Sequence, residues 1–293
     1  MLQPQRGSAT LIGFSAVLMW SLLGPLGAYA DVVPAFLLNA ICFGISSLVA
    51  FTRIAMMPNK GRVFRQPLSL WLMGIVGVFG YHAFYFLGLR NAPPVEANLI
   101  NYLWPVLIVL FSALLPGERL RWFHVAGGGL GLCGAGLLVV GGAGLSFSGD
   151  ASLGYACSAL AALIWGSYSV LSRRFGNAPT ETVAVFCLAT AVLSLLFHVQ
   201  FEETVWPADA SQWIAVVAMG LMPLGLSFFT WDIGMKYGDI QLLGVSAYTA
   251  PLLSTALMIV LGIGELNGRV VMACFLIVGG ALVAAKDLLL KPR

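Results

Sequence analysis

Aromatic and amide side chains recur at helical spacing in two stretches of the chain that are otherwise apolar. The stretches contribute Tyr81, His82 and Tyr85, and then Asn98, Asn101 and Tyr102. Residues four apart share one face of a helix, so Tyr81 and Tyr85 are expected to point the same way. Rings that stack and amides that form hydrogen bonds can orient a small amphipathic molecule. The spacing therefore predicts a binding cavity, although such groups also bond neighbouring helices in membranes.

Three tryptophans extend this predicted lining. Trp20, Trp104 and Trp165 lie well inside apolar segments, where an indole N–H needs a protein or cavity partner. A later part of the chain repeats the mixture of rings and hydroxyls, and its members are Ser227, Phe228, Trp231, Ser246 and Tyr248. We expect this second set to face the first across the cavity.

Prolines inside apolar segments are candidate gating points. A proline within a helix removes one backbone hydrogen bond and frees a carbonyl, which permits a bend. Pro25, Pro105 and Pro251 occupy such positions. Static kinks are the alternative interpretation.

The elements that must hold these residues are membrane helices. The chain is 59% hydrophobic and 9% charged, with a mean hydropathy of +0.92, whereas soluble domains carry about 25% charged residues. A helix needs roughly 20 apolar residues to cross a bilayer. Ten runs of that length predict an all-α integral membrane protein, and they lie near 9–30, 33–52, 68–90, 94–115, 122–142, 152–172, 181–200, 211–235, 239–262 and 269–288.

The basic residues orient these spans in the lipid bilayer. A cytoplasmic N-terminus would leave only Arg90 and Arg269, of the 15 lysines and arginines, on the outer side. Because positive loops stay in the cytoplasm, both termini are expected there. The formal charge of +3 then reflects membrane orientation, and no nucleic-acid-binding patch is predicted.

The chain contains an internal duplication. Residues 86–105 align without a gap on residues 232–251, so that Tyr102 meets Tyr248 and Pro105 meets Pro251. Residues 1–146 and 147–293 are therefore the expected repeats, with five spans each. An odd number of spans inverts the second repeat in the membrane, an arrangement typical of secondary transporters that work by alternating access. One such chain can form a pathway alone, so a monomer is expected.

Groups for catalysis, metal binding or ion coupling are sparse. The sequence holds no HExxH motif, and its five cysteines lie in apolar segments without ligand spacing. His82 and Asp232 could carry a coupling proton. A neutral histidine bonding a neighbouring helix, and pairing of Asp232 with Lys236, explain them more simply. We expect no enzyme, no channel, no cofactor and no metal, and the coupling ion stays open.

Several motifs carry a family resemblance. The motifs are "LMWSLLGP" (18–25), "LIWGSYS" (163–169), "PGERL" (116–120) and "GIGEL" (262–266). They resemble the paired EamA-type repeats of the drug/metabolite transporter superfamily over essentially the whole chain. The stretches "YHAFYFLGL" and "NLINYLWP" look most like the YddG-type aromatic amino-acid exporters of bacterial inner membranes. The resemblance implies export of aromatic and other bulky neutral amino acids. A drug or small-metabolite exporter of broad specificity is the alternative.

Overall fold

The computed structural model describes residues 4–140, 145 and 147–286, and every regular element within them is helical. The first half contains α1 (Arg6–Trp20), α2 (Leu23–Tyr29), α3 (Ala35–Ala55), α4 (Gly61–Phe64), α5 (Leu68–Ile75), the π-helical η1 (Val76–Gly80), α6 (Tyr81–Asn91), α7 (Pro94–Asn101), α8 (Trp104–Ser112) and α9 (Trp122–Val140). The second half contains η2 (Gly149–Ala151), α10 (Ser152–Ser172), η3 (Arg173–Phe175), η4 (Thr180–Thr182), α11 (Val183–Phe201), α12 (Ala210–Leu221), the π-helical η5 (Met222–Leu226), α13 (Ser227–Tyr237), α14 (Ile240–Ser246), α15 (Thr249–Val260) and α16 (Gly268–Ala284).

Most of the expected membrane spans correspond to long apolar helices among the described residues. Nine helical segments are long and apolar enough to cross a bilayer, and Gly268–Ala284 is a shorter apolar helix. This short helix coincides with the tenth expected span. The expected ends of the fifth span (141–142) and the tenth span (287–288) lie outside the described residues, as do Lys291 and Arg293.

Three of the expected spans are interrupted, so each consists of two helices. The interruptions are Ser21–Leu22, Tyr102–Leu103 and Ala247–Tyr248. Each lies within four residues before Pro25, Pro105 or Pro251. A proline cannot donate to the carbonyl four residues earlier and its ring crowds that carbonyl, so the helix breaks in the preceding turn. The sequence positions of these bends therefore follow from the prolines.

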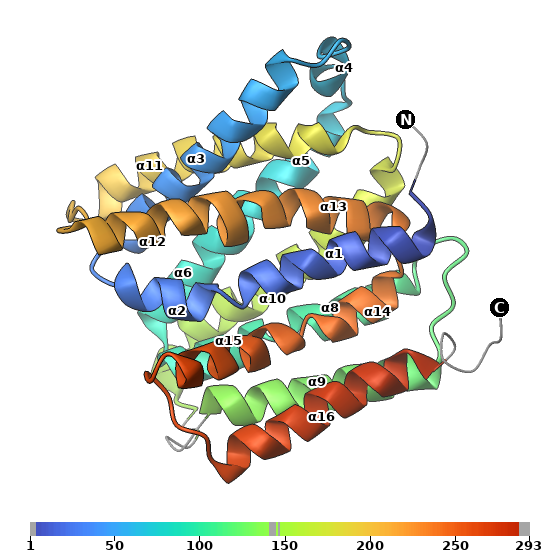
Figure 1. Cartoon of the computed structure of the whole chain (residues 1–293), viewed down its shortest axis with the longest axis vertical. Coiled ribbons are helices and arrows are strands. Elements are labelled where there is room, and N and C mark those ends of the chain that lie inside the picture. Colours follow the sequence, from blue (N-terminus) through green and yellow to red (C-terminus); the bar gives the residue numbers. More distant parts are fainter. Residues whose placement is uncertain (1–3, 141–144, 146, 287–293) are drawn as a thin grey trace.

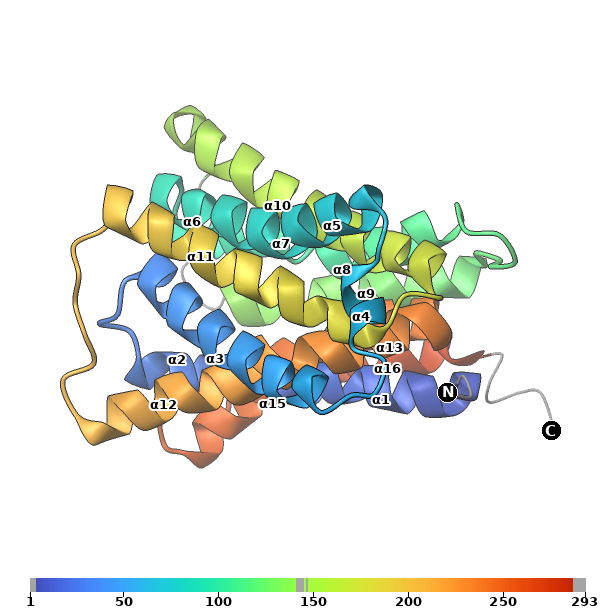
Figure 2. The same cartoon turned by 90° about the horizontal axis from the view of Figure 1, so that it is seen from above.

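The helices pack as a bundle of pairs from the two halves (Figure 1). Within this bundle α11 packs on α3, α13 on α1 and α10 on α6, while α16 packs on α9. In Figure 2, α6 and α10 lie in one layer and α1, α12 and α13 in another. The α1–α13 pair is close because two glycines meet: a Cβ added to Gly13 would lie 2.8 Å from the Cα of Gly234. Small residues permit such approaches between membrane helices.

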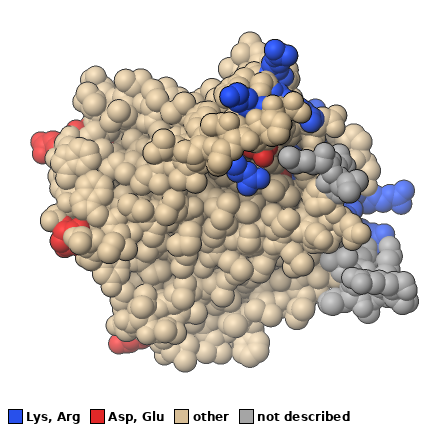
Figure 3. All heavy atoms as spheres, turned by 45° about the horizontal axis from the view of Figure 1, so that its top comes forward, with Lys and Arg blue, Asp and Glu red and all other residues tan. Residues whose placement is uncertain are grey.

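The two ends of the bundle differ in charge. We call the end formed by residues 53–67, 113–121, 173–179 and 236–239 the basic end, and the end formed by residues 30–34, 91–93, 202–209 and 261–267 the acidic end. Figure 3 shows Lys and Arg gathered toward one end, while most of the visible Asp and Glu residues lie at the other. The N-terminal helix α1 starts at the basic end, where Arg6 contacts Asp239.

Candidate binding cavity

One cavity of about 640 Å³ lies inside the bundle and extends to the acidic end. Its walls come from both halves of the chain. The first half contributes Trp20, Leu23, Gly27, residues 30–35, Leu38, Asn39, Tyr81, His82, Tyr85, Phe86, Asn98, Asn101, Tyr102 and Trp104. The second half contributes Trp165, Met219, Leu224, Phe228, Ala247, Ala250, Pro251 and Ser254. The cavity therefore has a rim in the α2–α3 loop and a closed end in the middle of the bundle.

Tryptophans form the closed end. The ring centroid of Trp20 lies 5.9 Å from that of Trp104 and 5.9 Å from that of Trp165, and both pairs meet edge to face. Trp231 supports this floor from behind, 4.9 Å from Trp20. Edge-to-face packing is a favourable arrangement for aromatic rings. The floor is an aromatic barrier between the cavity and the basic end.

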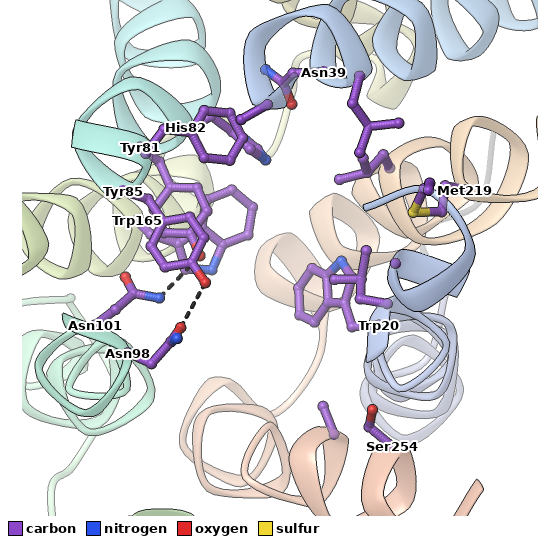
Figure 4. Close-up of a pocket in the computed structure, with 18 of the residues that line it drawn as sticks. Trp20, Asn39, Tyr81, His82, Tyr85, Asn98, Asn101, Trp165, Met219 and Ser254 are labelled. Carbon is purple, nitrogen blue, oxygen red and sulfur yellow. Dashed lines mark hydrogen bonds between the residues drawn. The ribbon is translucent and has the colours of Figure 1, made fainter. Parts of the chain in front are cut away.

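The α6–α7 wall combines rings with hydrogen bonds. The rings of Tyr81 and Tyr85 are nearly parallel, with centroids 5.9 Å apart and an angle of 4° between their planes. The Tyr85 hydroxyl donates to Oδ1 of Asn98 at 2.6 Å, and Nδ2 of Asn101 donates to the Tyr81 hydroxyl at 3.3 Å. Figure 4 shows these residues with Trp165 on one side of the cavity and Trp20 on the other. A flat ligand between the two sides would meet aromatic rings on both.

His82 occupies the same wall in a fixed orientation. Its Nδ1 lies 2.8 Å from the backbone oxygen of Val78, and the residue is 6% exposed. A carbonyl oxygen can only accept, so Nδ1 carries the hydrogen and, in the neutral ring, Nε2 is an acceptor. Rings of Phe43 and Phe228 lie 5.1 Å and 6.2 Å from the imidazole. Aromatic rings therefore cover much of the imidazole.

The second predicted set is divided by the structure. Phe228 and Pro251 line the cavity, whereas Ser246, Tyr248 and Trp231 are buried in the packing around it. The Tyr248 hydroxyl donates to the backbone oxygen of Tyr102 at 3.0 Å, and the Trp231 indole donates to Ser169 Oγ at 3.0 Å. Ser227, which is also buried, donates to the oxygen of Pro223. The Tyr248 and Trp231 bonds join different helices, whereas the Ser227 bond lies within one helical segment.

The predicted gating prolines also lie in different surroundings. Pro25 and Pro105 are buried outside the cavity lining, and Pro251 is part of that lining. The break that accompanies Pro25 lets α2 diverge from the line of α1. Leu23 and Gly27 of α2 line the cavity as a result.

Several lining residues were missed by the sequence reasoning. They are Asn39, Met219, Leu224, Ala250 and Ser254. Asn39 carried a usable signal, because an amide within an apolar span is costly unless it has a partner or a function. The apolar residues carried no such signal, since they resemble any lipid-facing side chain.

The expected pair of Asp232 and Lys236 is present. Lys236 Nζ lies 2.8 Å from Asp232 Oδ2, and both side chains are at most 4% exposed. Thr180 donates to the same carboxylate oxygen at 2.7 Å, and Lys236 also donates to the backbone oxygen of Ala178. Both charges therefore have partners, and they lie at the basic end, away from the cavity.

A second ionic cluster closes the basic end. Glu118 forms ion pairs with Arg173 and with Arg6, and Arg6 reaches Asp239 at 3.1 Å. Arg173 also donates to the backbone oxygen of Met235 at 2.7 Å. We call Arg6, Glu118, Arg173 and Asp239 the basic-end cluster. It connects segments from both halves of the chain. In the described ranges, no group of three or more His, Cys, Asp or Glu side chains is placed to hold a metal ion.

Comparison with known proteins identifies the family. The chain is 53% identical to a protein of Ancylobacter novellus named aromatic amino acid exporter YddG, over 95% of this chain and 97% of that one. It is 27% identical to the Salmonella typhimurium protein of the same name, over 85% of this chain and 87% of that one. A solved crystal structure matches 98% of this chain and 100% of its own, with a TM-score of 0.93 and 51% identity. The model of the EamA-like transporter family matches twice, at residues 7–140 and 152–285, so this multi-pass membrane protein belongs to the EamA-like transporter family.

Proposed function

We propose that this protein exports aromatic and other bulky neutral amino acids across a bacterial inner membrane. The aromatic cavity of about 640 Å³ is the observation that carries the proposal. Tyr81, Trp20 and Trp165 provide ring faces and edges for an apolar side chain. The amides and hydroxyls among the lining residues can orient the polar end of an amino acid.

The charge of the lining supports a neutral substrate. None of the described lining residues is a lysine or arginine, and Asp31 at the rim is the one acidic member. Phosphorylated cargo would call for cationic partners. A zwitterion has no net charge and can be held by dipoles and rings. The names of the two similar proteins, both aromatic amino acid exporters, agree with this class of substrate.

Alternating access between inverted repeats is the proposed mechanism. The two family matches coincide with the two halves. The π-helical segments η1 and η5 precede α6 and α13, which have corresponding places in the duplicated sequence. The first helix of the first repeat, α1, starts at the basic end. The first long helix of the second repeat, α10, ends there, because η3 directly after it places Arg173 on Glu118. These opposite directions are what an inverted repeat requires.

The orientation follows from the charge of the two ends. Exposed Lys and Arg gather at the basic end, which supports its placement in the cytoplasm together with both termini. The cavity would then open outward in this structure. Export would require a second state in which the basic end opens and the acidic end closes, with Pro25, Pro105 and Pro251 at the bends. Both repeats lie in one chain, so a monomer can form the complete pathway.

An exporter of broad specificity remains the second candidate. The tryptophan floor and tyrosine wall would stack with many flat molecules. Saturable phenylalanine uptake that is inhibited selectively by other aromatic amino acids would favour the amino-acid exporter over the exporter of broad specificity.

Uptake of labelled phenylalanine into proteoliposomes tests the proposal. Uptake should saturate without an imposed ion gradient, and tryptophan and tyrosine should compete far better than alanine or lysine. The variant Trp165→Leu, which removes a ring from the floor, should lower uptake. Trp206→Leu is the matched control, because Trp206 is 55% exposed and is not part of the cavity lining. Absence of phenylalanine uptake, even with a pH gradient, would refute the amino-acid proposal.

A further inference from the structure

Asn39 has an unsatisfied acceptor at the cavity. The residue lies in the second turn of α3, toward the acidic end, and is 1% exposed. Its Nδ2 donates to Ser194 Oγ at 2.8 Å, while its Oδ1 has no hydrogen-bond partner among the described residues. A buried polar atom of this kind is unusual, because its lost hydration is not replaced. A ligand that donates a hydrogen bond would replace it.

The neighbours of Asn39 place it opposite His82. Phe36, three residues before Asn39, packs on Phe86 with ring centroids 5.3 Å apart. Phe43, four residues after Asn39, packs on His82 at 5.1 Å. Residues three and four apart share one helix face, so Asn39 lies between these two ring contacts on the same face of α3, which also meets α11 through Ser194. Figure 4 shows Asn39 and His82 at the same end of the cavity.

His82 adds a second acceptor to this end. Because Nδ1 donates to Val78, Nε2 of the neutral ring accepts. Both Asn39 and His82 line the cavity. Two acceptors suit a group that only donates, and an ammonium group has three donors and no acceptor. The rings of Phe43, Phe86 and Phe228 pack around the imidazole and can attract a cation further.

We propose that Asn39 Oδ1 and His82 Nε2 form the subsite that receives the ammonium group of the transported amino acid. This assignment rests on the proposed function. The protein would then recognise a free amino group of the substrate in addition to its aromatic side chain. A carboxylate would be repelled by the same two acceptors, so the carboxylate of the substrate lies elsewhere in the cavity.

The other unsatisfied side-chain oxygens fit this role less well. Asn101 Oδ1 is also unsatisfied, but Figure 4 shows this oxygen turned away from the open space while Nδ2 points to Tyr81. Ser158 and Thr190 also have unsatisfied hydroxyls, and neither residue lines the cavity. Thr190 lies on α11, one turn from Ser194, and is therefore a matched control for Asn39.

The subsite is tested with ligands that lack one polar group. Compared with phenylalanine, 2-phenylethylamine keeps the ammonium group but lacks the carboxylate, and 3-phenylpropanoate keeps the carboxylate but lacks the ammonium group. Each is added as a competitor of labelled phenylalanine uptake into proteoliposomes. The wild-type protein should be inhibited more strongly by the amine. The variant Asn39→Leu, which keeps the number and branching of side-chain heavy atoms and removes the acceptor, should raise the apparent KM for phenylalanine about tenfold. The same variant should lower the inhibitory potency of 2-phenylethylamine by a similar factor and leave the potency of 3-phenylpropanoate unchanged.

Two further variants control for packing. Asn39→Asp retains an acceptor and should keep the preference for the amine. Thr190→Val removes an unsatisfied hydroxyl outside the cavity lining, and it should change neither the KM for phenylalanine nor the potency of either competitor. If Asn39→Leu does not fold, the wild-type ligand series and Asn39→Asp decide the question.

The outcomes separate the two proposals. The Asn39→Leu variant could still take up phenylalanine while both competitors lose inhibitory potency equally, or while neither loses any. Either result would overturn the ammonium subsite and leave the proposed function intact. A wild-type protein inhibited as strongly by 3-phenylpropanoate as by 2-phenylethylamine would overturn it as well. No phenylalanine uptake by the wild-type protein would instead refute the proposed function, on which the subsite depends.

Discussion

The acidic end of the bundle contains an open cavity, whereas the basic end is closed by two layers. The first layer is the tryptophan floor, and the second is formed by the buried Asp232–Lys236 pair and the basic-end cluster. The duplicated sequence alone would suggest more similar ends. Glu118 and Glu265 occupy corresponding positions, yet Glu118 has two arginine partners while Glu265 is exposed and has no ion pair among the described residues.

In the proposed mechanism, this difference places the barrier to transport at the basic end. Opening the basic end would separate partly buried charges, which is costly because each would lose its partner before water can replace it. Opening the acidic end requires no comparable separation at Glu265. Variants that alter one end at a time can test this difference, and those at the most buried charges should have the largest effect.

The variant Lys236→Met should have the largest effect. It leaves the Asp232 carboxylate, 4% exposed, without its cation, and loss of one member of a buried pair typically costs about 3–5 kcal/mol. Thermal unfolding in detergent measures the loss. The double variant Asp232→Asn, Lys236→Met should be more stable than Lys236→Met alone, and Lys60→Met, at an exposed position, should match the wild type. Equal stability of the single and double variants would contradict this account.

Glu118→Gln should loosen the basic end with a smaller loss of stability. The Glu118 and Arg173 side chains are 9% and 19% exposed, and a hydrogen bond to a charged group contributes about 1.5–3 kcal/mol. A cysteine at Ala16, which is fully buried beneath the floor, should react faster with a water-soluble maleimide in an otherwise cysteine-free chain. Arg119→Gln, an adjacent exposed charge, is the control. Unchanged labelling would show that the cluster does not close this end.

Pro25→Ala should narrow the acidic end. The alanine N–H can bond to the Ser21 carbonyl and favour a continuous helix from α1 to α2. A cysteine at Gly27, where a Cβ has open space, reports access to the cavity. Its labelling should slow several-fold, while the Ala16 cysteine should keep its wild-type rate. Faster labelling at Gly27 would mean that the proline restricts the cavity instead of opening it.

The smallest effect concerns pH at the acidic end. Hydrogen bonds from the Ser211 hydroxyl and the Gln212 N–H hold the pKa of Asp209 below its usual range. A lowered folded pKa means that this cap stabilises α12 above the unfolded pKa of about 3.9 and loses its effect as pH falls through the folded value. The protection factor of the Gln212 N–H against hydrogen exchange should therefore fall in acid. Asp209→Asn keeps an acceptor without titrating, and it should remove this pH dependence.

Much of the architecture was predictable from local sequence. Apolar runs located the spans because each needs a hydrocarbon environment, and Pro25, Pro105 and Pro251 located the three interruptions because proline acts on its own helical turn. Spacing of four residues predicted the Asp232–Lys236 pair. Pairing and bending of this kind depend only on residues within one helix.

The composition of the cavity was less predictable. Trp20, Trp104 and Trp165 line it, whereas Trp231, an equally apolar ring inside its span, lies behind the floor. Tyr102 lines the cavity and Tyr248, its counterpart in the duplication, does not. Helical spacing says which residues share a face, but it does not say which face a buried helix turns toward the cavity.

The sequence by itself determined the membrane environment, the duplication and the points where helices bend, because hydropathy and proline act locally. The tertiary structure alone decided which end is open and which arginines reach Glu118. It also decided that the Asn39 Oδ1 acceptor has no partner at the cavity among the described residues. Arg6, Glu118 and Arg173 are far apart in the chain, and their contact depends on how whole helices pack. Packing of that kind is a property of the complete bundle and has no signature in any single span.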